Sequence, residues 1–273
     1  MRLWIGIACA IGCAGREAED APCPAEVVQV ETPASGFQVV TPVVEVPPES
    51  EVQDCFFLEA PTDEATCVSS IVLAVADGTH HAAVFRDDAG EIGSVEEDCW
   101  GPRSATPLLP ASDEMGWALP PGVVWRIGAR DRLMIQVHGV NGATQEPGSA
   151  CVAAVASFET AACEGTAEVM SFDIPNEAEG TCAFAEESRI VGAGASCGTI
   201  GLVGQTPFFE ATGREDAARI DVTIPAGASV EWVRPEAEDY DITFGPQVEL
   251  DGCGPNSLAT LWVAPTTAGI VCR

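Results

Sequence analysis

Short apolar runs rich in Val and Ile recur along the chain, and Pro, Gly, Asp and Asn residues separate them. The clearest runs are VVQV, SSIVLAV, VVWRI, LMIQV, RIDVTI and TLWVA. Within 132–139, Leu133, Ile135 and Val137 share one face of an extended chain and His138 lies on the other, which is the alternation of a half-buried strand. No long window repeats with a helical period between recognisable caps. The pattern therefore predicts an all-β protein.

The length of the chain, 273 residues, allows one large or two ordinary domains. Many short strands separated by turns are typical of sandwiches and barrels. We expect two jelly-roll-like antiparallel β-sandwich domains that pack together, the first at 25–158 and the second at 159–273.

The first residues, MRLWIGIACAIGC, have the composition of an export signal. Arg2 is a short positive region, an apolar core too short to span a bilayer follows it, and the residues that end in Cys13 resemble a bacterial lipobox. We expect a signal peptide at 1–12 and a linker at 13–24 that carries a lipid on Cys13. The protein would then lie outside the cytoplasm and meet the membrane only through this anchor. A secreted protein without the lipid is the alternative.

Ten cysteines remain once Cys9 and Cys13 are set aside, and no two of them form a C-x-x-C pair. An even number at wide spacings in an exported chain favours five disulfides over zinc knuckles.

The formal net charge is −30, and all the basic residues are arginines. Without lysine, the chain has no residue for Schiff-base chemistry or for a phosphate-binding loop. An acidic surface is a poor partner for nucleic acid and for anionic membranes. The charge thus excludes several classes of function and indicates none by itself.

The three histidines are His80, His81 and His138. Neutral imidazole is the commonest metal ligand in proteins, and a set of three suits copper or zinc. On a flat strand His80 and His81 point to opposite faces, so both reach one metal only where the strand twists or ends. The alternative is that the three have unrelated roles, one at a turn, one on the surface and one as a satisfied polar group.

Two segments around the histidines resemble a known family. FQVVTPVVEVPPESEVQDCFF (37–57), followed by THHAAVF (79–85), resembles the first domain of the copper type II, ascorbate-dependent monooxygenases, the family of peptidylglycine α-hydroxylating monooxygenase and dopamine β-monooxygenase. WALPPGVVWRIGARDRLMIQVHGVNG (117–142) is similar to the family's later strand with a third histidine. The resemblance covers most of 23–155.

This resemblance implies that His80, His81 and His138 are the ligands of the family's electron-relaying copper, with one copper per chain. Gly139 stands where the family commonly has a tyrosine.

The second half of the chain lacks the ligands of the family's catalytic copper. EESRIVGAGASCGTIGLVGQ (186–205) and GPNSLATLWVAP (254–265) resemble the ligand-bearing segments, but apolar residues stand at the ligand positions. Ala193 and Ala195 replace two histidines, and Leu258 replaces a methionine. Because these side chains offer copper no lone pair, the resemblance implies that the catalytic site is lost.

The resemblance also implies three disulfides, Cys23–Cys151, Cys55–Cys99 and Cys182–Cys272. Cys197 and Cys253 fall beside the lost ligand positions, where a disulfide between them would cross-link the vacated site. Cys67 and Cys163 then remain as a pair by elimination.

Other chemistries have weaker support. GASCG (194–198) matches a nucleophile elbow at Ser196, but no histidine follows to complete a triad. A calcium loop near Asp87, Asp88 and Glu91 competes with the commoner role of turn acids in solvent. A sugar-binding platform competes with core packing for the tryptophans Trp100, Trp117, Trp125, Trp232 and Trp262.

We therefore expect an extracytoplasmic copper-binding protein, a degenerate relative of the monooxygenases that keeps only the electron-transfer copper site. An active ascorbate-driven monooxygenase with an atypical catalytic site, which would recruit Met134 or Met170, is the alternative. The second alternative is a structural surface lipoprotein whose histidines are relics.

Overall fold

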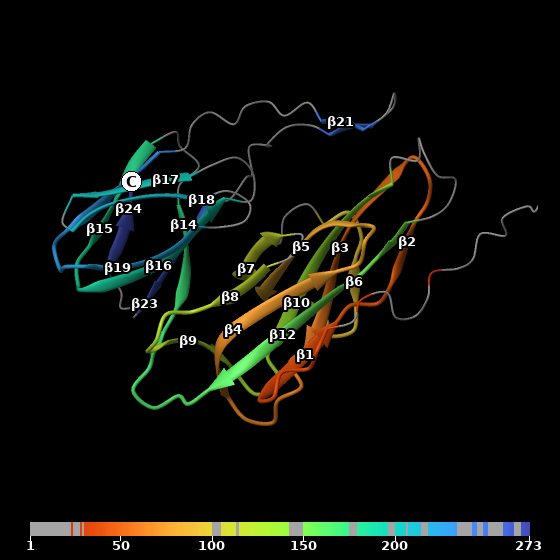
Figure 1. Ribbon diagram of the computed structural model, residues 1–273, viewed down its shortest axis with the longest axis horizontal. Helices are drawn as coiled ribbons and strands as arrows, with labels where there is room; N and C mark the ends of the chain where they lie inside the picture. The colour runs from red at the N-terminus through yellow and green to blue at the C-terminus, as the bar shows by residue number, and fades with distance from the viewer. Residues whose placement is uncertain are drawn as a thin grey trace, which may run out of the picture.

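The structure, a computed structural model, contains β-strands as its regular elements (Figure 1). The described residues are 23, 28, 30–99, 105–112, 115–141, 150–174, 179–195, 200–205, 207–213, 218–233, 242–244, 248–250, 259–264 and 269–273. Every regular element in these ranges is a strand, which confirms the all-β class. Within the same ranges, no helix has the length and apolar character needed to cross a membrane.

The strands between residues 36 and 168 pair only with one another. Six of them form a sheet: β1 (Gly36–Val40), β4 (Thr66–Val75), β8 (Met115–Ala118), β9 (Val123–Ile127), β12 (Ala154–Ala161) and β13 (Ala167–Glu168). Their order is β1-β12-β4-β9-β13, with β8 also paired to β4. A second sheet holds β3 (Ser50–Glu59), β5 (Thr79–Arg86), β6 (Val95–Glu96), β7 (Thr106–Ser112) and β10 (Arg132–Asn141), in the order β6-β3-β10-β5-β7. The pair β2 (Val44–Val46) and β11 (Ala150–Val152) completes this set.

The strands from residue 170 onwards form a separate set. A four-stranded sheet contains β14 (Met170–Ile174), β16 (Ser188–Ala195), β19 (Ala218–Ile224) and β23 (Ala259–Ala264), in the order β14-β23-β16-β19. A five-stranded sheet contains β15 (Glu179–Phe184), β17 (Ile200–Gln205), β18 (Phe208–Gly213), β20 (Ser229–Val233) and β24 (Ile270–Cys272), in the order β18-β17-β20-β15-β24. The hairpin of β21 (Ile242–Phe244) and β22 (Val248–Leu250) is the last pair. The boundary expected from the sequence, at 158 and 159, lies inside β12.

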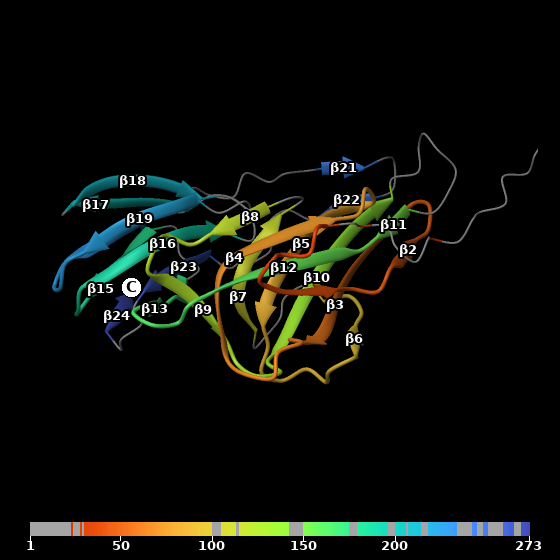
Figure 2. The same cartoon turned by 60° about the horizontal axis from the view of Figure 1, so that its bottom comes forward.

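The two large sheets of the first half face each other across one hydrophobic core (Figure 2). Ile71 and Phe158 enter this core from the six-stranded sheet, and Leu133, Ile135 and Val137 enter it from β10. The alternation along 132–139 therefore has the physical basis that the pattern predicts, with one face of β10 toward the core and the other toward a cover of loops.

The two central strands of the four-stranded sheet, β23 and β16, are buried on both faces. Leu261 and Val263 of β23 belong to the second hydrophobic core, whereas Trp262 and Ala264 of the same strand belong to the first. A strand with two buried faces reads as a continuous apolar run, which is how TLWVA appears in the sequence. The two cores thus share this sheet as a common layer.

Tryptophans fill the junction between the two cores. The rings of Trp117 and Trp262 meet edge to face with centroids 4.9 Å apart, and Trp125 lies against Trp117 at 5.7 Å. The indole Nε1 of Trp262 donates a hydrogen bond of 3.1 Å to the carbonyl of Pro107. A Cβ at Gly192 would lie 2.4 Å from the Trp117 ring, so only glycine fits at this point of β16.

Four disulfides cross-link the described residues: Cys23–Cys151, Cys55–Cys99, Cys67–Cys163 and Cys182–Cys272. The first, second and fourth are the pairs that the family resemblance implies, and the third is the pair expected by elimination. Disulfides of this number indicate an oxidising, extracytoplasmic environment. The expected Cys197–Cys253 disulfide, the signal peptide and Cys13 lie outside the described residues.

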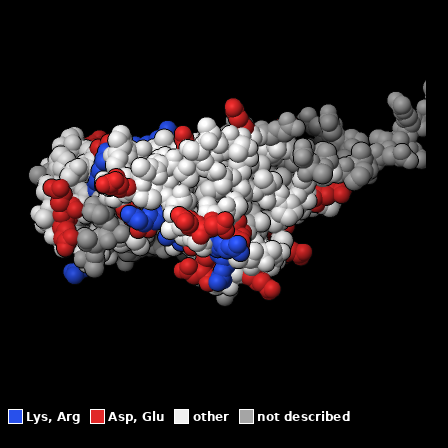
Figure 3. All heavy atoms as spheres, turned by 90° about the horizontal axis from the view of Figure 1, so that it is seen from below, with Lys and Arg blue, Asp and Glu red and all other residues white. Residues whose placement is uncertain are grey.

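The arginines are partly neutralised by neighbouring carboxylates. On the face that Figure 3 shows, several of the blue groups lie beside red ones. Arg189 makes the closest pair, with Nε 2.6 Å from Oδ1 of Asp221, and Arg86 and Arg130 have carboxylate partners at 3.8 and 3.5 Å. The hydrogen bond to Arg189, more than any other influence, lowers the pKa of Asp221 below its ordinary value.

Candidate metal centre

The three histidines come together at one end of the five-stranded sheet of the first half. His138 lies in β10, the central strand of this sheet, and His80 and His81 lie in the neighbouring β5. His138 and His81 are direct cross-strand partners. His138 shares its face of β10 with Met134 and Gln136, so the cluster lies on the sheet surface that faces away from the main core.

A β-bulge brings the two adjacent histidines to one place. His81 pairs with His138 and Thr79 pairs with Gly139, so His80 is an extra residue in β5 that the register of β10 does not match. A bulge bends its strand and re-aims the side chains around it. Adjacent histidines on a flat strand point to opposite faces, and the bulge is the departure from a flat strand that lets both imidazoles approach one point.

Glycines allow the bulged end of the two strands to pack closely on β11. A Cβ at Gly139 would lie 2.3 Å from Cγ1 of Val152, and a Cβ at Gly78 would lie 2.7 Å from the carbonyl oxygen of Cys151. Neither position has room for a larger residue. Gly139 is therefore required by packing in this chain.

The ligand atoms are close enough to bind one ion. Nδ1 of His80 and Nδ1 of His81 are 3.0 Å apart, and one nitrogen from each of the three rings lies within 4.8 Å of the others. Two nitrogens bound to one tetrahedral zinc at 2.0–2.1 Å would be about 3.3 Å apart. The His80–His81 separation already has this scale, and a ring nitrogen of His138 lies within 4.8 Å of both partners. The residues therefore fit a metal of the copper or zinc type.

Burial keeps the inner rings neutral. His81 is partly buried and its pKa falls to about 3, mainly through burial and further through the nearby His138 and His80. Burial also lowers the pKa of His138, although the hydrogen bond that its ring donates to Glu51 opposes that change. A neutral imidazole has a lone pair for a metal ion, whereas a protonated one has none. Both rings are therefore ready to bind metal at neutral pH.

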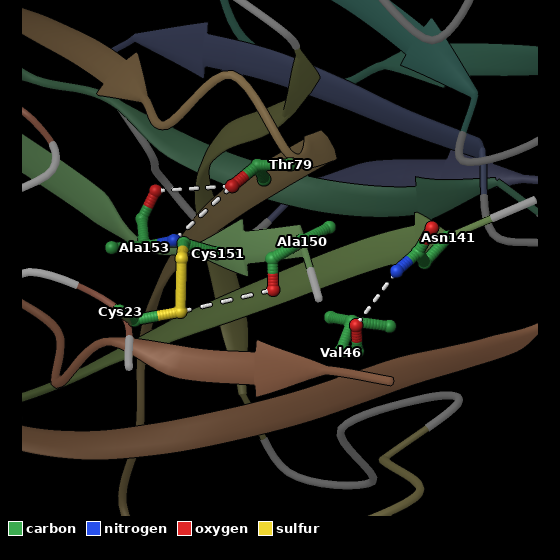
Figure 4. The surroundings of a disulfide bond; sticks show 7 residues. All are labelled: Cys23, Val46, Thr79, Asn141, Ala150, Cys151 and Ala153. Atoms are coloured by element: carbon green, nitrogen blue, oxygen red, sulfur yellow. Dashed lines mark hydrogen bonds between the residues drawn. A yellow bond between two sulfur atoms is a disulfide. The ribbon is translucent and has the colours of Figure 1, made fainter. Parts of the chain in front are cut away.

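The surrounding strands are firmly tied at this point (Figure 4). The Thr79 hydroxyl, one residue before His80, donates to the Ala153 carbonyl and accepts from the Ala153 amide, both at 3.2 Å. The Asn141 amide donates to the backbone of β2 at 2.9 Å. The Cys23–Cys151 disulfide anchors the N-terminal segment to β11 beside these contacts. These contacts fix the backbone on both sides of the cluster.

Of the residues that the resemblance aligns with ligands of a catalytic copper, Ala193 and Ala195 lie in the other set of sheets. Ala193 is fully buried in the second hydrophobic core, where its side chain has no access to an ion. The backbone of Ala195 belongs to β16, and Leu258 lies outside the described residues. Of the methionines considered as substitutes, Met134 is buried in a small cluster with Phe57 and Phe85, and Met170 is exposed on β14.

The competing sites are explained by ordinary structural roles. The Asp87 carboxylate accepts hydrogen bonds from the amides of Ala89 and Gly90, which makes it part of a turn. Ser196 lies outside the described residues, as does Trp100. The other four tryptophans are fully buried, so they serve packing: Trp117, Trp125, Trp232 and Trp262. Among the described residues, the histidine cluster is the one group of three or more metal-ligating side chains.

One contact of the site was not foreseen from the sequence. Oε2 of Glu51, in β3, lies 3.4 Å from Nε2 of His138. With 42 acidic residues in the chain, no local pattern distinguishes this carboxylate from the others. Only the register of β3 against β10 brings it to the site.

Comparison with known proteins adds no relative to this description. No protein-family model matches the chain, and no curated protein matches it in sequence. The function is therefore argued from the histidine cluster itself.

Proposed function

We propose that this protein binds one copper ion outside the cytoplasm through His80, His81 and His138. It is a degenerate relative of the copper type II monooxygenases that keeps the electron-transfer site and has lost the catalytic one. A lipid on Cys13 holds it at the membrane surface. The observation that carries the proposal is the meeting of three imidazoles, two of them neutral through burial, around a point that a β-bulge creates.

Three further features support the choice of copper and of a non-catalytic role. Imidazole ligands suit copper as well as zinc, and the segments around the histidines resemble a copper family. His80 is exposed, so an ion has a path from solvent to the cluster. Ala193, at a position that would carry a catalytic ligand, is sealed in the second core.

Titration of the mature, disulfide-bonded protein with Cu(I) and Cu(II) tests the proposal. We expect one ion per chain in the wild type and a loss of affinity of at least about tenfold in His80→Ala and in His138→Ala, because each removes one of three ligands. Met170→Ala is the matched control, since it removes an exposed soft ligand from the other set of sheets.

Binding that is unchanged in His138→Ala would contradict the proposal. Competition with Zn²⁺ on the same samples decides between the two metals, and tighter binding of zinc than of either copper ion would replace copper as the assignment. For the anchor, Cys13→Ser is expected to release the protein from the membrane fraction, and retention there would argue against lipidation.

A further inference from the structure

Glu51 lies beside the three-histidine cluster without belonging to it. It is in β3, which borders β10 on the side opposite β5. Its Oε2 is 3.4 Å from Nε2 of His138, and the two side chains are 27% and 5% exposed. The group of ligand atoms that lie within 4.8 Å of one another contains the histidines alone. The carboxylate therefore contacts one ligand ring rather than the position of the ion.

This contact determines which nitrogen of His138 faces the ion. An ionised carboxylate only accepts hydrogen bonds, so Nε2 of His138 must carry the proton of the neutral ring. The lone pair is then on Nδ1. His80 and His81 also approach each other through their Nδ1 atoms. A carboxylate behind a ligand histidine is a general means of fixing the tautomer and the ring orientation of that ligand.

The charge of Glu51 acts differently on the two oxidation states of copper. Three neutral imidazoles contribute no charge, so the bound ion keeps two positive charges as Cu(II) and one as Cu(I). A fixed negative charge attracts the first about twice as strongly as the second. Because the Glu51 side chain is partly buried, water screens this attraction only in part.

We propose that Glu51 is a positioning residue of the metal centre, which holds His138 with Nδ1 toward the ion and makes the site prefer Cu(II) to Cu(I). The inference rests on the proposed copper binding and assigns to that site a means of lowering its reduction potential.

Two substitutions separate the charge from the hydrogen bond. Glu51→Gln keeps an oxygen that accepts from Nε2 and removes the charge, so we expect Cu(II) affinity to fall about tenfold and Cu(I) affinity to fall about threefold. The ratio of the two affinities then changes about threefold, which corresponds to a potential about 30 mV higher for this one-electron couple. Glu51→Ala removes the acceptor too, so it should weaken binding of both ions. Glu49→Gln is the matched control, because it removes a carboxylate from an exposed turn two residues away.

The measurements are competition titrations with chelators specific for each copper ion, and nitrogen-15 NMR of the metal-free protein at neutral pH. The NMR spectrum should show His138 protonated on Nε2 in the wild type and in Glu51→Gln, and a mixture of tautomers in Glu51→Ala.

An unchanged ratio of Cu(II) to Cu(I) affinity in Glu51→Gln, with copper binding intact in the wild type, would overturn the inference and leave the proposed function standing. A wild type that binds neither ion would overturn both. An Nδ1–H tautomer in the wild type would overturn the positioning role without reference to copper.

Discussion

The neutral state of His81 predicts that the metal-free protein loses stability in mild acid. Its pKa in the folded protein is about 3, against an ordinary value of 6.5. Below pH 6.5 the unfolded chain therefore takes up a proton that the folded protein does not, and stability falls with pH until the folded pKa is reached. Each pKa unit corresponds to 1.36 kcal/mol, so His81 alone is expected to cost about 2 kcal/mol between pH 7.5 and pH 5.0. The window lies above the range in which most carboxylates titrate.

His81→Gln is the perturbation that isolates this effect, because glutamine keeps polar atoms at the position and does not titrate. Urea unfolding of chelator-treated, disulfide-intact protein, followed by tryptophan fluorescence, gives the free energy of unfolding at both pH values. Between pH 7.5 and pH 5.0, the free energy of unfolding of the wild type should fall by about 2 kcal/mol more than that of the variant. All other titrating groups contribute equally to the two proteins. Protonation of surface carboxylates also reduces the repulsion between negative charges, and it does so equally in both proteins. Subtracting the change in unfolding free energy of the variant from that of the wild type therefore removes this effect. The same change with pH in both proteins would refute the assignment of a neutral, buried imidazole.

Two further predictions concern packing. Gly139→Ala should cost about 1–3 kcal/mol of unfolding free energy and lower copper affinity, because the new Cβ would meet Val152 at 2.3 Å beside the bulge. Gly116→Ala is its control in urea unfolding, since a Cβ there meets only an ordinary contact at 3.4 Å, and equal losses in the two variants would contradict the packing argument. Trp262→Phe should cost about 1–3 kcal/mol in the same assay, because it leaves the partly buried Pro107 carbonyl without its donor. A neutral result would show that this hydrogen bond is replaced by water.

The sequence predicts the general fold because each of its signals is local. Alternation along 132–139 identifies β10 and the face of it that carries Leu133, and the run TLWVA predicts a strand, which the structure then shows to be buried on both sides. The sheet shared by the two cores could not be predicted from the sequence. It depends on contacts between residues far apart in the chain, such as the contact between the rings of Trp117 and Trp262. The boundary expected at 158 and 159 lies inside β12.

The candidate site shows a similar division. Three histidines are visible in the sequence, and their residue type makes them candidate metal ligands. The bulge that makes them converge is a matter of register between β5 and β10, which no single strand encodes. Glu51 enters through the register of a third strand, and one carboxylate among many carries no signal of its own.

Because the two cores share one sheet, the first half of the chain depends on the second half to cover its apolar interior. If the chain ended after β13, the pocket that Trp262, Ala264 and Val191 fill would open, and Trp117 would face water. The second half thus covers the core of the first. A region whose removal would expose the interior of its neighbour contributes to stability whether or not it binds a ligand of its own. Burial of this apolar surface is by itself a reason for the chain to keep its second half.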